Sequence, residues 1–341
     1  MSRSPESVTP RVSVLMPVYD AARTLPACLQ SLARQTEARW ECVAVDDGSR
    51  DESAAVLQAA ARRDARIRVV SMPHRGIVAA LEAGLAHCRA PVVARMDADD
   101  WMHRERLALQ LSALNARPDL SAIGAHVRVF PRSGLRDGRR RYESWLNGLR
   151  DAPSVRRDAY VECPVAHPTL MVRSDVLRAF GYRARGWPED YDLVLRLLGA
   201  GHEIGVLPRR LVGWRDTSAR LSRSAPEYAL ERFTDCKAFH LARGLLGTSD
   251  RYVLWGYGST GRALRRALLR YDRAPSHIVE LHPGRLGQRI HGAPVIAPEA
   301  LADMPATPIV VSVAGEEPRA LIRRALHGMG LRDGSHFVCA A

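Results

Sequence analysis

The stretch VSVLMPVYD, residues 12–20, decides the fold class of this 341-residue chain. An apolar run rich in β-branched side chains is typical of a buried strand, and the proline and polar residues that follow mark its end. Apolar side chains then recur at helical spacing over residues 25–32. The sequence therefore predicts a strand followed directly by a helix.

The same alternation of strand and helix continues along the chain. Apolar runs predict strands at residues 40–45, 67–72 and 91–96, and the segments between them predict helices at 54–61 and 77–85. This alternation favours an α/β fold with a doubly wound, mostly parallel sheet. In such a sheet, ligands bind at the edge where the strands reach their carboxyl ends.

A second block of segments is expected to cover that edge. A strand is predicted at residues 169–172 and helices are predicted at 174–180 and 191–198, and one separate helix is predicted after this block, at 228–245. We assign these segments to a first domain that comprises residues 1–245.

A new strand and helix begin after residue 250. Residues 252–255 predict a strand, GYGSTG at 256–261 predicts a glycine-rich turn, and a helix follows to about residue 270. The remaining predicted elements are a strand at 278–281, a strand at 309–313 and a helix at 318–329. These elements predict a second, small Rossmann-like α/β domain at residues 246–341.

The formal net charge of +13 comes from 50 lysine and arginine residues against 37 acidic ones, spread along the whole chain. Lys237 is the only lysine. Nucleic-acid binding requires a compact basic patch, so we expect no nucleic-acid partner. Small anionic ligands suit this charge distribution better.

The cysteines form no Cys-x-x-Cys pair and no zinc-type spacing, so we expect free thiols in a reducing compartment. No apolar run reaches the roughly 18 to 20 residues that span a bilayer. The sequence indicates a cytoplasmic protein, and peripheral attachment at the inner face of the membrane stays open. The six cysteines are Cys28, Cys42, Cys88, Cys163, Cys236 and Cys339.

Asp97 and Asp99 directly follow the strand predicted at 91–96. Their carboxylates can share a hard divalent cation such as Mg²⁺ or Mn²⁺ and leave positions open for phosphate oxygens. The alternative explanation of an Asp-rich strand end is a solvated turn that caps the next helix. Polar clusters also end the first two strands, at residues 17–19 and 46–49.

The order and spacing of four segments closely resemble glycosyltransferase family 2. The segments are VSVLMPVYDAARTLPACLQSLARQ at 12–35, ECVAVDDGSRDES at 41–53, GIVAALEAGL at 76–85 and VARMDADDWMHRERL at 93–107. The resemblance extends over about residues 11–225. It implies a GT-A fold and inverting transfer of a sugar from a nucleotide diphosphate sugar to a glycan or lipid-linked acceptor, as in bacterial polysaccharide or glycolipid synthesis.

The resemblance also implies roles for the three strand ends. Residues that match Tyr19 and Asp47 hold the nucleoside base in the family, and the first aspartate of the D-x-D, here Asp97, lies near the ribose and the metal. Asp99 matches the metal ligand. The nucleotide-sugar site implied in this way consists of Pro17, Val18, Tyr19, Asp47 and Asp97, with Asp97 and Asp99 as metal ligands.

The segment GWPEDYD at 186–192 resembles the family's Glu-Asp motif at the start of a helix. This resemblance makes Asp190 the base that removes the acceptor hydroxyl proton. It also places His167 and Glu189 on the acceptor side. The alternative is that Glu189, Asp190 and Asp192 only stabilise the positive end of their helix.

Two positions depart from the family's pattern. In the family, the arginine that matches Arg215 is often followed two residues later by a histidine. Thr217 takes that place here, so we do not expect this segment to supply a third metal or phosphate ligand. Glu82 stands where many relatives have asparagine, and the sequence gives no reason for the change.

The glycine-rich turn predicts a second nucleotide site. Gly256, Gly258 and Gly261 would let a helix N-terminus approach a pyrophosphate, and Glu280 would accept a hydrogen bond from a ribose hydroxyl. With GAPVIAPEAL at 292–301, the segment resembles the small Rossmann-like domain that precedes many sugar acyltransferases and binds nucleotide sugars. The alternative is a domain kept for packing or dimerisation.

Two other functions compete with sugar transfer. An NAD-dependent oxidoreductase using the C-terminal domain is the first, but its common Tyr-x-x-x-Lys pair would need tyrosine where Phe233 precedes Lys237. A nucleotide-sugar sensor or scaffold without turnover is the second. A sensor has no need of a base such as Asp190, so a glycosyltransferase is favoured.

Overall fold

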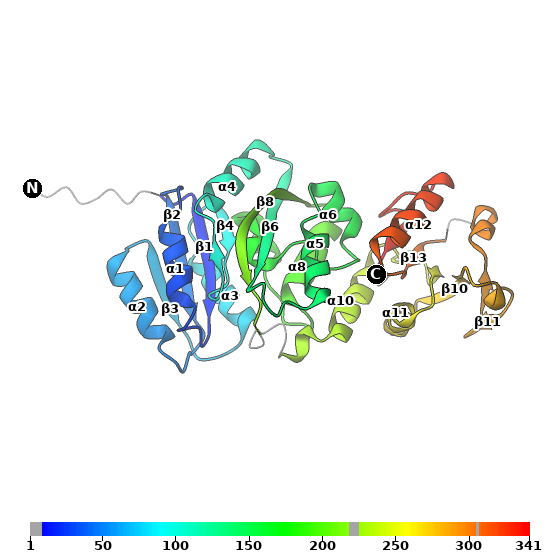
Figure 1. Ribbon diagram of the computed structural model, residues 1–341, viewed down its shortest axis with the longest axis horizontal. Helices are drawn as coiled ribbons and strands as arrows, with labels where there is room; N and C mark the ends of the chain where they lie inside the picture. The colour runs from blue at the N-terminus through cyan, green and yellow to red at the C-terminus, as the bar shows by residue number, and fades with distance from the viewer. Residues whose placement is uncertain (1–8, 218–224, 305–306) are drawn as a thin grey trace, which may run out of the picture. The chain divides into compact units, whose positions relative to one another are not determined.

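The computed structural model describes residues 9–217, 225–304 and 307–341 (Figure 1). The chain forms two compact units, of which the first comprises Met1–Val155, Val165–Ala184 and Gly201–Arg220, and the second comprises Arg156–Pro164, Arg185–Ala200 and Leu221–Ala341.

The first sheet contains eight described strands in the order β3-β2-β1-β4-β7-β6-β8-β5. Strands β3, β2, β1 and β4 are mutually parallel, as are β6 and β8, whereas β7 and β5 pair in the antiparallel sense. The strands are β1 Val12–Val18, β2 Trp40–Asp46, β3 Ile67–Ser71, β4 Val92–Arg95, β5 Trp101–Met102, β6 Leu120–Phe130, β7 Met171–Arg173 and β8 Glu203–Arg215. The predicted α/β class with a mostly parallel sheet is confirmed.

Helices separate these strands along the chain, as predicted for a doubly wound fold. They are α1 Leu25–Ala33, α2 Ser53–Arg63, α3 Ile77–His87, α4 Arg106–Ala116, α5 Asp137–Leu146, α6 Ala152–Asp158, the 3₁₀ turn η1 His167–Thr169, and α7 Ser174–Phe180. The turn η1 makes β7 begin later than the strand predicted at 169–172.

Alternate side chains of β1 pack on opposite faces of the sheet, as the period of a strand requires. Val14 and Met16 share a buried core with Leu25 of α1. Leu15 points to the other face, where a Cβ atom on Gly84 of α3 would lie only 2.4 Å from Leu15 Cδ1. Glycine is therefore required for α3 to approach the sheet.

The second sheet contains six described strands in the order β11-β12-β10-β9-β13-β14. All are parallel except β11, and Figure 1 shows α11 and α12 on opposite sides of the strands. The strands are β9 Arg251–Trp255, β10 Ala274–Val279, β11 Arg289–Ile290, β12 Ala293–Ile296, β13 Ile309–Val311 and β14 Phe337–Cys339. This order, with β9 central, is that of a doubly wound sheet.

The remaining helices belong to the second compact unit. They are α8 Glu189–Gly199, η2 Pro226–Tyr228, α10 Leu230–Arg243, α11 Ser259–Leu269, η3 Pro283–Arg285, η4 Pro298–Asp303 and α12 Glu316–Gly328. The predicted boundary between residues 245 and 246 falls between α10 and β9, whereas the compact units group α8 and α10 with the second sheet. The division into domains 1–245 and 246–341 stays a prediction.

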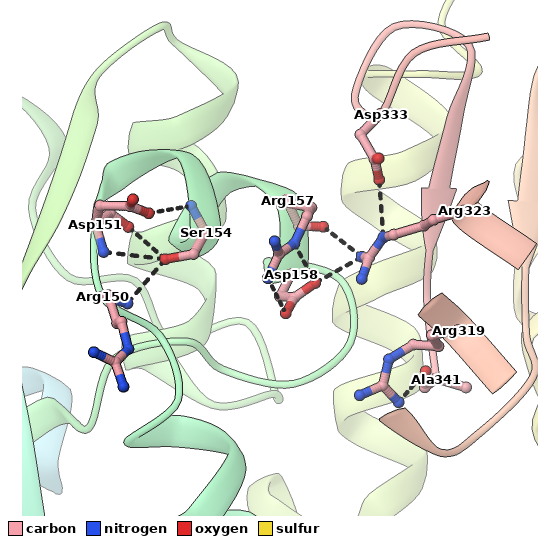
Figure 2. Close-up of polar contacts among 9 residues, drawn as sticks. All are labelled: Arg150, Asp151, Ser154, Arg157, Asp158, Arg319, Arg323, Asp333 and Ala341. Carbon is pink, nitrogen blue, oxygen red and sulfur yellow. Dashed lines mark hydrogen bonds and ion pairs between the residues drawn. The ribbon is translucent and has the colours of Figure 1, made fainter. Parts of the chain in front are cut away.

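An ion pair between Asp158 and Arg323 joins residues 156–164 to α12 within the second unit (Figure 2). Arg323 Nη2 lies 2.6 Å from Asp158 Oδ1, and Arg323 Nε lies 3.2 Å from Asp333 Oδ1. Arg319 donates to the carbonyl oxygen of Ala341 at 3.0 Å. Breaking a buried ion pair leaves an uncompensated charge, so this network stabilises the packing of a segment that lies before the predicted boundary against the C-terminal helix.

A buried arginine supports the end of β4. Arg106 is fully buried, and its Nη2 donates to the carbonyl oxygen of Arg95 at 2.8 Å while its Nε donates to Gln110 Oε1 at 3.0 Å. Burial, together with the nearby charge of Arg95, lowers the pKa of Arg106 to about 9. The guanidinium still satisfies polar groups at the point where β4 runs into the acidic motif.

We predict that Arg106→Leu lowers the free energy of unfolding by about 1 to 3 kcal/mol, because the Arg95 carbonyl and the Gln110 amide lose their buried donor. Arg104→Leu, at an exposed position two residues away, is the matched control and should change stability by less than about 0.5 kcal/mol. Urea denaturation of both variants measures the difference. Equal stabilities of the two variants would show that the buried guanidinium contributes nothing.

Candidate active site

Polar side chains gather where β1, β2 and β4 end in the first unit. Tyr19 follows β1, is 38% exposed, and stacks on His74 with ring centroids 4.1 Å apart. The two rings present an aromatic surface of the kind that can stack on a nucleoside base.

Asp47, after β2, is buried and organises the loop that carries His74. Its Oδ1 accepts a hydrogen bond from the backbone N–H of Arg75 at 2.8 Å, and its Oδ2 accepts one from Gly76 at 2.9 Å. The His74 ring nitrogen Nδ1 also lies 2.9 Å from Oδ2. Gly48 has a φ of +69°, and a Cβ there would lie 2.6 Å from His74 N, so the Asp-Asp-Gly turn needs its glycine.

Three carboxylates follow β4 in one short turn. Asp97, Asp99 and Asp100 each offer an oxygen, and these oxygens lie within 4.8 Å of one another. Arg95, whose side chain is buried, forms an ion pair with Asp97. The D-x-D motif thus brings its two aspartates together, and Asp100 is a third member that the sequence analysis did not single out.

The donor set of this cluster suits a hard divalent cation. Its ligand atoms are carboxylate oxygens, which Mg²⁺ and Mn²⁺ prefer. The neighbouring thiol of Cys28 donates to the carbonyl oxygen of Asp97 at 3.3 Å. Burial raises the pKa of Cys28, with smaller contributions from Cys42 and the three aspartates, which favours the neutral thiol.

Arg215, at the end of β8, holds the acidic turn from the other side. Its backbone N–H donates to Asp100 Oδ1 and its Nε donates to the carbonyl oxygen of Asp99, both at 2.6 Å. Its guanidinium lies 4.7 Å from the ring centroid of Phe130. The sequence analysis missed this role because the contact joins residues more than a hundred positions apart.

His167 and Glu82 occupy structural positions in the first unit. His167 is buried, and its Nε2 lies 3.1 Å from the Tyr182 hydroxyl. Glu82 Oε1 accepts a hydrogen bond from the backbone N–H of Tyr182 at 2.5 Å. The acceptor-side role of His167 stays a prediction.

Asp190 and Glu189 begin α8 in the second unit, whereas the acidic cluster lies in the first. Glu189 is buried, and Asp190 is half-buried and accepts a hydrogen bond from the Tyr191 N–H at 2.7 Å. Three acidic residues in the first turn of α8 match the positive end of the helix dipole, so this interaction contributes here whatever else Asp190 does.

The glycine-rich turn joins β9 to α11, as predicted. Gly256 has a φ of +91°, and a Cβ on Gly261 would lie 2.4 Å from the Gly256 carbonyl oxygen, so both glycines are required by the turn itself. A Cβ on Gly258 would meet no atom within 4 Å. Glu280 Oε1 already accepts from the Tyr257 N–H at 3.0 Å. A ligand at this turn stays a prediction.

Lys237 has a structural environment. It is half-buried on α10, and its Nζ donates to the carbonyl oxygens of Val161 at 2.8 Å and Ala340 at 3.2 Å. Burial lowers its pKa. Both partners are backbone carbonyls, so the contacts of Lys237 are structural.

All six cysteines are buried free thiols, as expected. Within the described part of the chain, no helix combines the length and the apolar character that crossing a bilayer demands.

The architecture defines the class of protein. Two solved structures share the fold: TarS from S. aureus in complex with UDP-GlcNAc, at 16% identity and a TM-score of 0.56 over 76% of this chain and 72% of that one, and the mannosyltransferase PcManGT from Pyrobaculum calidifontis in complex with GDP-Man and Mn²⁺, at 17% identity and a TM-score of 0.50 over 97% and 85%. The fold is that of the GT-A glycosyltransferases.

Sequence comparison gives the family. The sequence model of the family described as Glycosyl transferase family 2 matches residues 13–180. The amylovoran biosynthesis glycosyltransferase AmsE of Erwinia amylovora is 34% identical over 222 residues, which cover 62% of this chain and 78% of AmsE. The chain belongs to glycosyltransferase family 2 and is a glycosyltransferase, as the resemblance implied.

We predict that Arg215→Ala weakens Mn²⁺ binding by about tenfold, because the acidic turn loses the side chain that fixes its backbone. Arg209→Ala, an exposed arginine of the same strand that pairs with Glu105, is the matched control and should bind as the unchanged protein does. Titration with Mn²⁺ followed by electron paramagnetic resonance measures both affinities. Unchanged Mn²⁺ affinity in Arg215→Ala would show that Arg215 does not contribute to the metal site.

Proposed function

We propose that this protein is a metal-dependent inverting glycosyltransferase that moves a sugar from a nucleotide diphosphate sugar to the hydroxyl of a glycan or lipid-linked acceptor. The observation that carries the proposal is the cluster of Asp97, Asp99 and Asp100 at the carboxyl end of β4, whose oxygens lie within 4.8 Å of one another. Departure of a nucleoside diphosphate requires charge stabilisation at such a place.

The donor is proposed to bind along the strand ends of the first unit. Tyr19, in the segment that starts at Pro17 and Val18, supplies an aromatic face together with His74, and Asp47 supplies the carboxylate that shapes the loop beside it. Complexes of the two structural neighbours with UDP-GlcNAc and GDP-Man support a nucleotide sugar as the ligand class.

Asp97 and Asp99 would hold Mg²⁺ or Mn²⁺, and the Mn²⁺ in the PcManGT complex supports this choice. When bound, the cation would neutralise charge that develops on the departing diphosphate. Arg95 pairs with Asp97 and reduces the repulsion among the three carboxylates before a cation arrives.

Asp190 is proposed as the base. It would take the acceptor hydroxyl proton while that oxygen forms a bond to the anomeric carbon and the bond from this carbon to the diphosphate oxygen breaks on the opposite face. Its half-buried position at the start of α8 and the hydrogen bond from the Tyr191 N–H support the assignment, because both hold the carboxylate in place. Glu189 and His167 are proposed for the acceptor side.

The setting is proposed to be polysaccharide or glycolipid synthesis on the cytoplasmic side of a bacterial membrane, with peripheral membrane contact. The name of the relative AmsE, an amylovoran biosynthesis glycosyltransferase, supports polysaccharide synthesis. The C-terminal sheet is proposed as a second nucleotide-binding domain around Gly256, Gly258, Gly261 and Glu280.

Substitution of the proposed base tests the mechanism. We predict that Asp190→Asn lowers kcat by about 10²- to 10⁴-fold and leaves donor affinity unchanged, because the base acts on the acceptor. Asp175→Asn, in the first turn of α7 and exposed, is the matched control for loss of an acidic helix N-terminus. Release of nucleotide from UDP-GlcNAc and GDP-mannose reports turnover. A near-normal rate in Asp190→Asn would contradict the assignment.

Substitution of the metal ligand tests the donor site. We predict that Asp99→Ala weakens Mn²⁺-dependent binding of the nucleotide sugar by about tenfold or more, because one charged ligand is lost. Asp119→Ala, an exposed aspartate paired with Arg117, is the control and should bind normally. Calorimetric titration of donor with and without Mn²⁺ measures the effect. An identical metal dependence in Asp99→Ala would reject the ligand role.

A further inference from the structure

The two buried acids that flank Asp190 are each held by a side chain from the segment that follows. The Tyr228 hydroxyl, in η2, donates to Glu189 Oε2 at 2.5 Å. His240 Nε2, in α10, lies 3.1 Å from Asp192 Oδ1. Both acids belong to the first turn of α8, so these contacts hold the turn at one position before Asp190 and one after it.

Asp192 is held by three side chains. It is fully buried, and besides His240 it accepts hydrogen bonds from Arg196 Nε at 2.7 Å and from Trp187 Nε1 at 3.1 Å. Burial alone would favour the neutral acid, but the hydrogen bonds from His240, Arg196 and Trp187 lower the pKa of Asp192 to about 2. The anion therefore persists, and its three donors restrict its orientation.

The donors are themselves packed in place. The Trp187 ring lies against Phe239 of α10, with centroids 5.2 Å apart, and Phe239 also contacts the ring of His240 at 5.1 Å. Side chains whose rotamers are locked by packing position a neighbouring group more accurately than mobile ones. The helix α10 thus supplies one donor to the first turn of α8, His240, and a ring, Phe239, that packs against a second donor, Trp187.

We infer that Tyr228 and His240 are positioning residues, which hold Glu189 and Asp192 so that Asp190 between them keeps one orientation toward the acceptor. We call these four side chains the acid clamp: Tyr228, His240, Glu189 and Asp192. The inference rests on the proposed role of Asp190 as base. A misplacement of about 1 Å at a reacting group costs up to about 100-fold in rate, so such a clamp would appear in kcat.

Cys236 raises the alternative of a bound cation, because its sulfur, an Asp192 oxygen and a His240 nitrogen lie within 4.8 Å of one another. Two observations favour the hydrogen-bonded clamp. Burial raises the pKa of the Cys236 thiol well above its usual range, which keeps it protonated. The Asp192 oxygens already accept hydrogen bonds from Arg196 and Trp187, and a cation beside the Arg196 guanidinium would be repelled.

Kinetics of the full-length chain test the clamp. We expect His240→Leu and Tyr228→Phe to lower kcat by about 10- to 100-fold with little change in the donor KM. His240→Gln, which keeps a donor at the position of Nε2, should restore most of the rate. Glu231→Gln, exposed on the same helix, is the control. The assay is Mn²⁺-dependent nucleotide release from UDP-GlcNAc and GDP-mannose.

A double-mutant cycle separates the clamp from the proposed base. If His240 acts through Asp190, His240→Leu adds no further loss in an Asp190→Asn background. An equal loss in both backgrounds would overturn the inference and leave the base in place. A near-normal rate in Asp190→Asn alone would instead contradict the assignment of Asp190 as the base, independently of the result for His240.

Two measurements need no turnover. Hydrogen exchange of the backbone at residues 189–193 should quicken at least about tenfold in His240→Leu relative to Glu231→Gln, and unchanged exchange would overturn the clamp. Elemental analysis of the purified chain should find no stoichiometric Zn²⁺. One Zn²⁺ per chain that is lost in Cys236→Ser would assign Asp192 and His240 to a cation site instead.

Discussion

Three carboxylates crowded at the end of one strand are the constraint on which the proposed donor site depends. Like charges about 4 Å apart repel by about 4 kcal/mol near a protein surface, so the turn at Asp97 to Asp100 would open unless cations or donors held it. Arg95 pairs with Asp97, and Arg215 fixes both the Asp99 carbonyl and the Asp100 carboxylate. These contacts keep the carboxylates close together before a divalent cation binds. Binding would therefore not carry the entropic cost of ordering the turn.

The first turn of α8 also contains clustered acids, and hydrogen bonds stabilise its buried anion. Asp192 is taken wholly out of water, which is costly for an anion, and Arg196, Trp187 and His240 offset the cost with hydrogen bonds. Tyr228 does the same for Glu189. The acidic turns of both units are held in part by residues from distant parts of the chain, Arg215 at Asp100 and His240 at Asp192. Their geometry therefore depends on tertiary structure rather than on the motifs alone.

This dependence explains what the sequence could and could not predict. The strands β1, β2 and β4 and the polar residues after them were predictable, because apolar periodicity and strand-end chemistry are local. The start of α8 at Glu189 was predicted within two residues. The contacts of Arg215 and His240 were not predictable, because each joins residues far apart in the chain, and nothing local marks an arginine or a histidine as a partner. The long strands β6 and β8 were not predicted either. In β8, the exposed residues 208–210 interrupt the apolar pattern.

Thermal unfolding of the full-length chain with UDP-GlcNAc and with GDP-mannose, each with and without Mn²⁺, tests the central claim most directly. The account predicts that a nucleotide sugar raises Tm only when Mn²⁺ is present, since a ligand at about 100 times its Kd stabilises the folded state by about 2.7 kcal/mol, equivalent to a few degrees. NAD serves as the comparison ligand. Stabilisation by NAD alone, or by nucleotide sugars to the same extent without Mn²⁺, would contradict a metal-dependent donor site at Asp97 and Asp99.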